Sequence, residues 1–237
     1  MKIQINATVC LGLLLFFTFA IHELFAQKSC TLPKPNFCTR NMNIAEKYAF
    51  IKRPKPFLCD TKTEGGGWIV IQRRVHQDTS FQRNWEDYKF GFGSPCTEDY
   101  WLGNERVHQL TSRGQYELRI DMTYQKQNYY ASYSSFKVDN ETNQYRLTLG
   151  EFQGNVTNEL VNHDTMMFST PDRDNDLGPN HSCAGQYQAG WWYKLCHMTN
   201  LNGHFGINAF GFGVIWYGLT TDYDSLSSVE MKIRKIK

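Results

Sequence analysis

Apolar and polar residues alternate most clearly near the middle of the chain. Residues Tyr116–Met122 alternate one by one, and similar alternation follows over residues 130–138 and 145–152. A period of two is typical of antiparallel strands that bury one face and expose the other. Shorter β-rich runs predict three more strands, at residues 48–51, 68–75 and 229–236.

Helical patterns are rare in this sequence. We predict a helix over residues 98–110. Residues 168–203 combine alternating aspartates with glycine, proline and asparagine, which predicts an ordered loop. The chain is therefore expected to adopt an α+β fold, with a central twisted antiparallel sheet, few helices and a loop-rich C-terminal region.

The N-terminus is typical of a secretory leader. Lys2 precedes an apolar run over residues 9–20, which is too short to span a bilayer comfortably, and small or polar residues follow it. We predict a signal peptide over residues 1–26, a short lead over residues 27–37 and one domain over residues 38–237. The expected localisation is secreted and extracellular.

Composition narrows the function classes. The 237-residue chain has a formal net charge of +2, so no bulk attraction to nucleic acid or to an anionic membrane is expected. Aromatic residues make up 15%, which suits aromatic-lined surface pockets and equally suits an aromatic core. Since no serine elbow, phosphate-cradling loop or zinc helix is found, we predict no enzyme.

Seven cysteines are present, and Cys10 falls in the predicted signal peptide, which leaves six. An even number in an oxidising compartment predicts disulfides and argues against a free catalytic thiol. The residues alone allow many connectivities, so they leave the pairing open.

The predicted loop contains an acidic cluster. Asp172, Asp174 and Asp176 alternate within a few residues, and a hard cation with oxygen ligands, calcium first, would offset their repulsion. An EF-hand is excluded. Counted from Asp172, the sixth position is Leu177, where an EF-hand needs glycine, and the twelfth is Cys183, where it needs glutamate. A solvated acidic turn is the alternative.

The motifs of this loop, and a second block upstream, resemble those of the fibrinogen C-terminal (fibrinogen-related) domain family, including ficolin- and tachylectin-like lectins. The resemblance covers about Cys38 to the C-terminus. It implies a disulfide-bonded, fibrinogen C-terminal-like globular domain of the fold class described above. The matching residues are Cys59-Asp60, Gly65-Gly66-Gly67-Trp68, Gln72-Arg73-Arg74, Trp85, Tyr88, Gly91-Phe92-Gly93, Trp101-Leu102-Gly103-Asn104, Phe168-Ser169-Thr170, Asp172, Asp174-Asn175-Asp176, Cys183-Ala184, Gly190-Trp191-Trp192-Tyr193, Cys196-His197 and Asn200-Leu201-Asn202-Gly203.

The resemblance implies two disulfides, Cys38–Cys59 and Cys183–Cys196. Cys30 and Cys96 are additional to that pattern. They would pair within the chain, which we favour, or Cys30 would form a bridge to another subunit.

For calcium, the resemblance implies side-chain ligands from Asp174 and Asp176 and backbone carbonyl ligands from Gly178 and Asn180. Asp172 would be a hydrogen-bond acceptor within the loop. The role of the ion is expected to be structural, because neutralising the aspartates orders the adjoining loop.

For a ligand, the resemblance implies an acetyl-binding pocket formed by Tyr187, Cys196, His197, Phe210 and Tyr223. A cis peptide is expected between Cys196 and His197, which would direct two backbone N–H groups toward the acetyl oxygen. This chain departs from many acetyl-binding members, because Phe210 stands where they have tyrosine and Gly211 where they have alanine. The alternative is that these aromatic residues only pack around a disulfide.

Two sequons, at Asn140 and Asn155, predict N-glycosylation on loops. The expected function is a secreted calcium-dependent lectin that recognises N-acetylated sugars such as N-acetylglucosamine, or other acetylated groups, in innate immune recognition. The alternative is a secreted protein-binding module, for a receptor or a haemostasis-related ligand, that uses the same region. A homo-oligomer is compatible with either function.

Overall fold

The computed structural model describes residues 38–43, 48–51, 57–96 and 99–236. The predicted signal peptide, the lead and Cys30 lie outside these ranges. Within the described ranges, no helix has the length and apolar character needed to cross a membrane.

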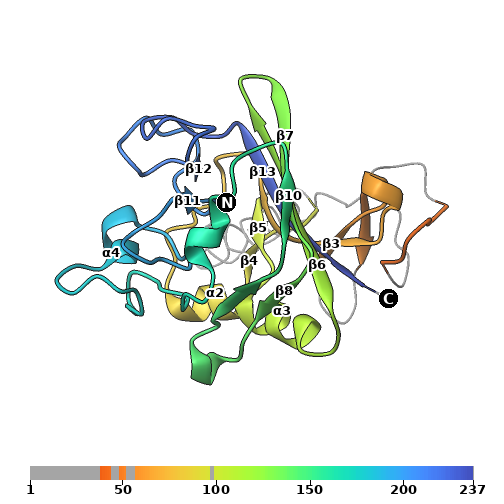
Figure 1. The fold of residues 1–237 in the computed structure, drawn as a ribbon, viewed down its shortest axis with the longest axis horizontal. Helices are drawn as coiled ribbons and strands as arrows, with labels where there is room; N and C mark the ends of the chain where they lie inside the picture. Colours follow the sequence, from red (N-terminus) through yellow and green to blue (C-terminus); the bar gives the residue numbers. More distant parts are fainter. Residues whose placement is uncertain (1–37, 44–47, 52–56, 97–98, 237) are drawn as a thin grey trace, which may run out of the picture. The chain divides into compact units, whose positions relative to one another are not determined.

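The main sheet is antiparallel and twisted, and the C-terminal strand lies near its centre (Figure 1). The strand order is β1-β2-β3-β13-β6-β7-β10. The bounds are β1 (Tyr48–Ile51), β2 (Phe57–Asp60), β3 (Trp68–Arg74), β13 (Ser228–Lys235), β6 (Tyr116–Tyr124), β7 (Gln127–Tyr133) and β10 (Phe152–Gly154).

The predicted alternation is confirmed in β6, where buried and partly exposed residues alternate from Tyr116 to Met122. Ile233 in β13 pairs with Leu118 on one side and with Ile69 on the other, so β13 joins the two halves of the sheet. These paired residues lie on one face of the sheet, where Leu118 and Ile233 belong to the hydrophobic core and partly buried Ile69 packs against it.

Short elements complete the fold, and α4, β11 and β12 gather at one side of the sheet (Figure 1). Their bounds are β4 (Phe92–Gly93), β5 (Tyr100–Trp101), β8 (Phe136–Val138), β9 (Leu147–Leu149), β11 (Thr199–Asn200), β12 (Ile215–Trp216), α2 (Trp85–Phe90), α3 (Asn104–Thr111) and α4 (Cys183–Tyr187), with 3-10 turns η1 (Thr63–Gly65), η2 (Glu141–Asn143) and η3 (Leu160–His163).

The predicted helix over residues 98–110 is too long at its start. Residues Tyr100–Trp101 form β5, and the helix begins only at Asn104. Gly103 explains the break, because its φ is +103° and a Cβ there would lie 2.7 Å from the backbone of Phe90. Only glycine fits this position without strain.

Two short helices escaped the sequence prediction. The Asn84 side chain accepts a hydrogen bond from the backbone N–H of Asp87 and so caps α2. The Ser182 side chain does the same for α4, inside the predicted loop, through the N–H of Gly185. Asparagine and serine are preferred N-cap residues, which was the available signal.

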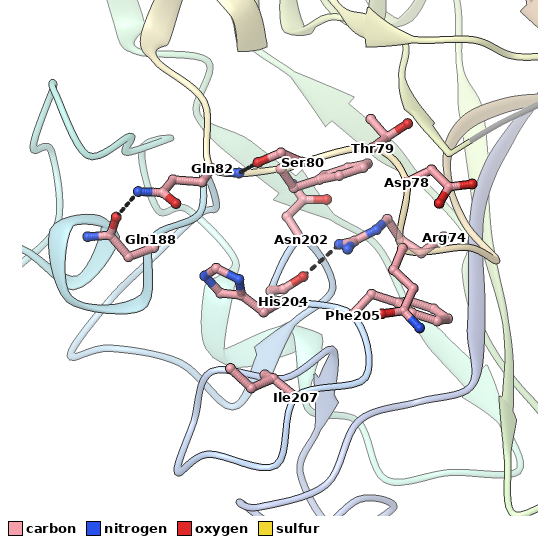
Figure 2. A pocket seen from close by; sticks show the side chains of 13 residues that line it. Arg74, Asp78, Thr79, Ser80, Gln82, Gln188, Asn202, His204, Phe205 and Ile207 are labelled. Carbon is pink, nitrogen blue, oxygen red and sulfur yellow. Dashed lines mark hydrogen bonds between the residues drawn. The ribbon is translucent and has the colours of Figure 1, made fainter.

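Side chains of β3 hold the segment after β11 in place. Gln72 Nε2 donates to the Leu201 carbonyl at 2.7 Å. Arg74 Nη1 donates to the Gly203 carbonyl at 2.8 Å (Figure 2). Buried hydrogen bonds of this kind fix the loop, because breaking one leaves a polar group without a partner and away from water.

Candidate ligand-binding site

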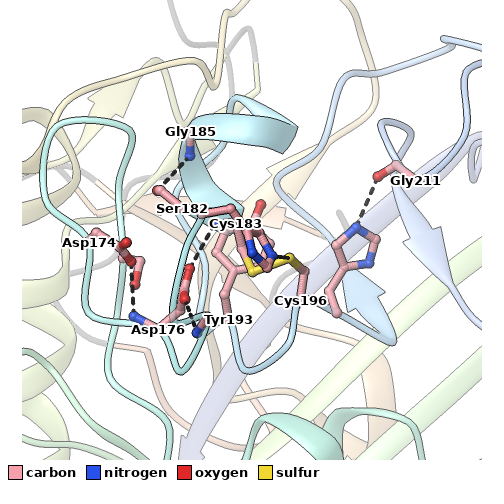
Figure 3. Close-up of a disulfide and its surroundings, with 12 residues drawn as sticks. Asp174, Asp176, Ser182, Cys183, Gly185, Tyr193, Cys196 and Gly211 are labelled. Carbon is pink, nitrogen blue, oxygen red and sulfur yellow. Dashed lines mark hydrogen bonds between the residues drawn. A yellow bond between two sulfur atoms is a disulfide. The ribbon is translucent and has the colours of Figure 1, made fainter.

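Asp174 and Asp176 in the acidic loop accept hydrogen bonds from backbone N–H groups of the same loop. Asp176 accepts hydrogen bonds from the N–H of Gly178 at 2.6 Å and from the N–H of Cys183 at 2.7 Å. Asp174 accepts from the N–H of Asp176 at 3.1 Å (Figure 3). Asp172 points elsewhere, since it accepts from the N–H of Trp85 and the hydroxyl of Thr170.

The loop offers oxygen donors of the kind that calcium takes. Burial raises the pKa of Asp176, its hydrogen bonds from Cys183 and Gly178 lower it, and the neighbouring Asp174 carboxylate raises it again, with a net rise. Two carboxylates that repel in this way favour a cation between them. The carbonyls of Gly178 and Asn180 accept no hydrogen bond from the described residues, so their oxygens are free to act as ligands.

Two other groups of metal-ligating side chains occur in the described ranges, and neither suits a metal. His181 lies beside Cys183 and Cys196, but a disulfide joins those two sulfurs and removes the thiolates. Asp60, Asp121 and Glu230 form the second group. The Lys232 ammonium lies among those three carboxylates and takes the place of a cation.

The disulfides implied by the resemblance are both present, Cys38–Cys59 and Cys183–Cys196. Cys30, the predicted partner of Cys96, lies outside the described residues. The predicted cis peptide is misplaced by one residue, because the cis bond joins Leu195 to Cys196. The Cys196–His197 peptide bond itself is not cis.

Buried His163 holds the backbone around Cys196. Its Nδ1 lies 2.8 Å from the Trp192 carbonyl, and its Nε2 accepts from the N–H of Thr199 at 3.0 Å and of Met198 at 3.2 Å. Burial lowers the pKa of His163 to about 3, so the ring is neutral, with Nδ1 as the donor. No sequence pattern singled out this residue, because its partners are backbone groups far along the chain.

Four of the five predicted ligand residues form two aromatic pairs, and the fifth, Cys196, directly precedes His197 in the chain. The rings of Tyr187 and His197 lie 4.5 Å apart, and those of Phe210 and Tyr223 lie 5.5 Å apart. Gly211 connects the pairs, because its carbonyl lies 3.0 Å from His197 Nε2 and its N–H donates to the Asp222 carbonyl at 2.7 Å.

The two pairs differ in exposure. Tyr187 is only 8% exposed, because the backbone of Gly211 lies against its ring, where a Cβ would come within 2.5 Å. Phe210 and Tyr223 are 54% and 60% exposed. A ligand would therefore meet Phe210 and Tyr223 first, and Tyr187 only at its edge.

Burial lowers the pKa of His197 to about 4, so this imidazole is neutral at physiological pH. The backbone N–H groups of Cys196 and His197 donate no hydrogen bond to any described residue. A small apolar cavity of about 180 Å³ opens beside them, and Leu195 and Met198 contribute to its wall. Of the five predicted ligand residues, only Cys196 and His197 line this cavity. The site therefore combines unpaired donors with apolar walls.

The predicted glycosylation residues are both exposed. Asn140 caps η2 with its side chain, and the Asn155 side chain accepts from the N–H of Tyr130 at 2.7 Å.

Comparison with known proteins gives a family match over most of the chain. The model of the C-terminal globular domain of fibrinogen beta and gamma chains matches residues 41–236. Human tenascin-R is 44% identical over 176 residues, which are 74% of this chain and 13% of tenascin-R. Ryncolin-4 of Cerberus rynchops is 44% identical over 185 residues, which are 76% of this chain and 53% of ryncolin-4. The chain thus spans about half of one relative and far less of the other.

Solved structures agree on the fold. The fibrinogen-like globe domain of human ANGPTL6 superposes with a TM-score of 0.75 at 37% identity, covering 80% of this chain and 89% of that domain. Lamprey fibrin D-dimer, complexed with the peptide Gly-His-Arg-Pro-amide, superposes with a TM-score of 0.74 at 27% identity, covering 97% of this chain and 87% of the lamprey chain.

Proposed function

This chain belongs to the family of fibrinogen C-terminal globular domains, and we propose that it is a secreted, calcium-dependent lectin that binds acetylated groups on glycans. The observation that carries the proposal is the pair of unpaired backbone N–H groups at Cys196 and His197, beside apolar walls. An acetyl group needs the same two features, hydrogen-bond donors for its oxygen and an apolar surface for its methyl group.

The role proposed for calcium follows from the contacts of Asp176. Its carboxylate accepts from the N–H of Cys183, and the Cys183–Cys196 disulfide links that residue to the donor pair. A calcium ion held by Asp174, Asp176 and the carbonyls of Gly178 and Asn180 would supply the positive charge that keeps these carboxylates ionised and in place. Calcium removal would then loosen the backbone at Cys196 and His197.

Neutral His197 fits this proposal. With Nε2 donating to the Gly211 carbonyl, the imidazole carries no charge that would have to be desolvated beside an acetyl methyl group. Phe210 and Tyr223 supply exposed aromatic faces of the kind on which sugar rings pack.

A protein-binding module is the second candidate. Leu195, Phe210 and Tyr223 are all exposed, and exposed apolar side chains of this kind also suit a peptide. The lamprey fibrin structure, with its bound tetrapeptide, adds to this reading. The two candidates use one surface, so competition between ligands separates them.

The test is retention of the secreted protein on acetylated resin, with calcium or with chelator, followed by elution with N-acetylglucosamine or acetate. We expect retention only with calcium and release by either ligand. Phe210→Ala should lower retention about tenfold or more. Phe90→Ala is the matched control, because Phe90 is equally exposed, at 54%, and belongs to α2.

Phe210→Tyr gives the opposite test. It restores the hydroxyl that many acetyl-binding relatives of this family carry, and one added hydrogen bond should strengthen binding by about fivefold. Failure of the calcium-loaded protein to bind any acetylated resin would overturn the lectin proposal and leave the protein-binding candidate.

A further inference from the structure

A larger cavity lies next to the candidate site and is not part of it. It measures about 340 Å³, within the usual range for small-molecule sites. The loop after β3 forms one side, and Gln188 with the segment after β11 forms the other (Figure 2). Its dimensions alone say little, so the chemistry of its lining decides what it could hold.

The cavity does not suit an anion. Arg74 is its only cationic lining residue within the described ranges, and that side chain is 2% exposed. The guanidinium already contacts the Asp99 carboxylate and the Gly203 carbonyl and lies over the Phe81 ring. A charge that is buried and paired in this way has little left to offer an incoming anion.

The cavity does not suit a metal ion either. Asp78 is the only carboxylate in its described lining. Asp99, behind Arg74, is occupied by the N–H groups of Val75 and His76. Oxygen-ligated cations need several such donors at one point, and they are lacking here.

The other polar groups of the lining remain, and three of their side chains have no hydrogen-bond partner among the described residues. The side chains of Gln77, Asp78 and His204 make no hydrogen bond to any described residue. Burial and the nearby Arg74 lower the pKa of His204, so its ring is neutral. Gln82 and Gln188 join their amides at the rim, and Figure 2 shows the His204 imidazole between this pair and Ile207.

Phe205 and Ile207 add apolar surface on one side of the cavity (Figure 2). Amides, a neutral imidazole and a carboxylate facing apolar side chains match a pyranose, which presents hydroxyls at its edge and C–H groups on its face.

A run of packed rings links the cavity to the candidate site, from His204 through Phe212 and Tyr187 to His197. Gln188 directly follows Tyr187 in sequence. The His204 and Phe212 rings lie 6.2 Å apart, and the Phe212 and Tyr187 rings lie 5.5 Å apart. Exposed Ile207 lies three residues before exposed Phe210 on the same segment. These contacts place the cavity within the span of a short oligosaccharide from His197.

We propose that the cavity is a second saccharide subsite, which takes a neutral sugar unit attached to the acetylated unit bound beside His197. The order of units rests on the proposed lectin function, whereas the sugar-binding character of the cavity rests on its own lining. This chain would then prefer acetylated oligosaccharides to the single sugar.

The first test measures affinity by calorimetry for N-acetylglucosamine and for its β1,4-linked dimer and trimer. We expect the dimer or trimer to bind about tenfold more tightly than the monosaccharide, as one or two added hydrogen bonds provide. His204→Ala and Asp78→Asn should abolish that gain and leave monosaccharide affinity unchanged within about twofold. Gln153→Ala, an exposed glutamine on β10, is the control.

The second test does not depend on the acetyl site. The imidazole proton signals of His204, assigned by their loss in His204→Ala, are followed by NMR as each saccharide is added. A shift with the dimer and trimer, and little with the monosaccharide, is expected.

An unchanged His204 signal at saturating trimer would overturn the subsite, whether or not the lectin function holds. Equal affinities for all three saccharides would overturn it too. Loss of monosaccharide binding in Phe210→Ala with the His204 shift retained would support the subsite separately from the acetyl site.

Discussion

Removing the His163 side chain should loosen the backbone that presents Cys196 and His197. His163 is fully buried and contacts three backbone groups, the Trp192 carbonyl and the N–H groups of Met198 and Thr199. In His163→Ala all three lose their partner at once. Trp192 and Thr199 are buried, so water reaches their polar groups poorly.

The magnitude follows from those three groups. An unsatisfied buried donor or acceptor destabilises a protein by about 1–3 kcal/mol. Counting the two buried groups in full and the partly exposed Met198 N–H as half, we expect a loss of about 2.5–7.5 kcal/mol in the free energy of unfolding. A small domain has about 5–15 kcal/mol in total, so the variant should be markedly weakened.

The assay is urea unfolding with disulfides intact, followed by tryptophan fluorescence. His163→Gln keeps one donor and one acceptor and should lose only about 1–2 kcal/mol. His108→Ala is the matched control, because His108 makes one hydrogen bond, to the Val138 carbonyl at 3.0 Å. A loss below about 1 kcal/mol in His163→Ala would refute the reasoning.

The same residue predicts a pH dependence. The pKa of His163 is about 3 in the folded protein and about 6.5 in the unfolded chain. The unfolded state therefore binds more protons between these values, and stability falls as pH drops from about 6.5, by up to about 1.4 kcal/mol per pH unit. His163→Gln should take up about one proton fewer on unfolding in this pH range, so its stability should depend less steeply on pH.

Two further predictions concern carboxylates. Asp176→Asn should weaken calcium binding and lower stability by about 1–3 kcal/mol even with chelator, because an amide cannot accept from both the Gly178 and Cys183 N–H groups. Calorimetry with calcium measures the first effect, and unfolding in the presence of chelator measures the second. Unchanged calcium affinity would argue against the site. Lys232→Met should cost about 3–5 kcal/mol in urea unfolding, since it strands buried Asp60. Burial alone would raise the pKa of Asp60, but Lys232 and Thr63 lower it to about 2, so wild-type stability should fall as pH drops from about 4 toward 2. In the variant the ammonium no longer offsets burial, so that loss should shrink or reverse.

The sheet could be predicted from sequence because its signal is local. Alternation along β6 records which side chains face the core, and the structure buries those residues. The start of α3 could not be predicted, because the limit at Gly103 comes from a contact with Phe90, which is distant in sequence. Periodicity contains no information about such a contact.

The candidate site divides in the same way. Residue types and order pointed to Asp174, Asp176 and His197, because carboxylate spacing and motif order are written in the chain. The sequence determined which functional groups the site contains and the family to which the chain belongs. The surroundings of each group, and hence its charge and exposure, were still undetermined.

Only the tertiary structure decided which groups remain free to bind. Folding buries Tyr187 beneath Gly211 and leaves Phe210 exposed, although sequence reasoning placed both in one pocket. It brings His163 to the backbone around Cys196, and His204 to a cavity formed by segments more than a hundred residues apart. The physical reason is that burial and hydrogen-bond satisfaction depend on every neighbour in space, whereas the chain specifies only its neighbours in sequence.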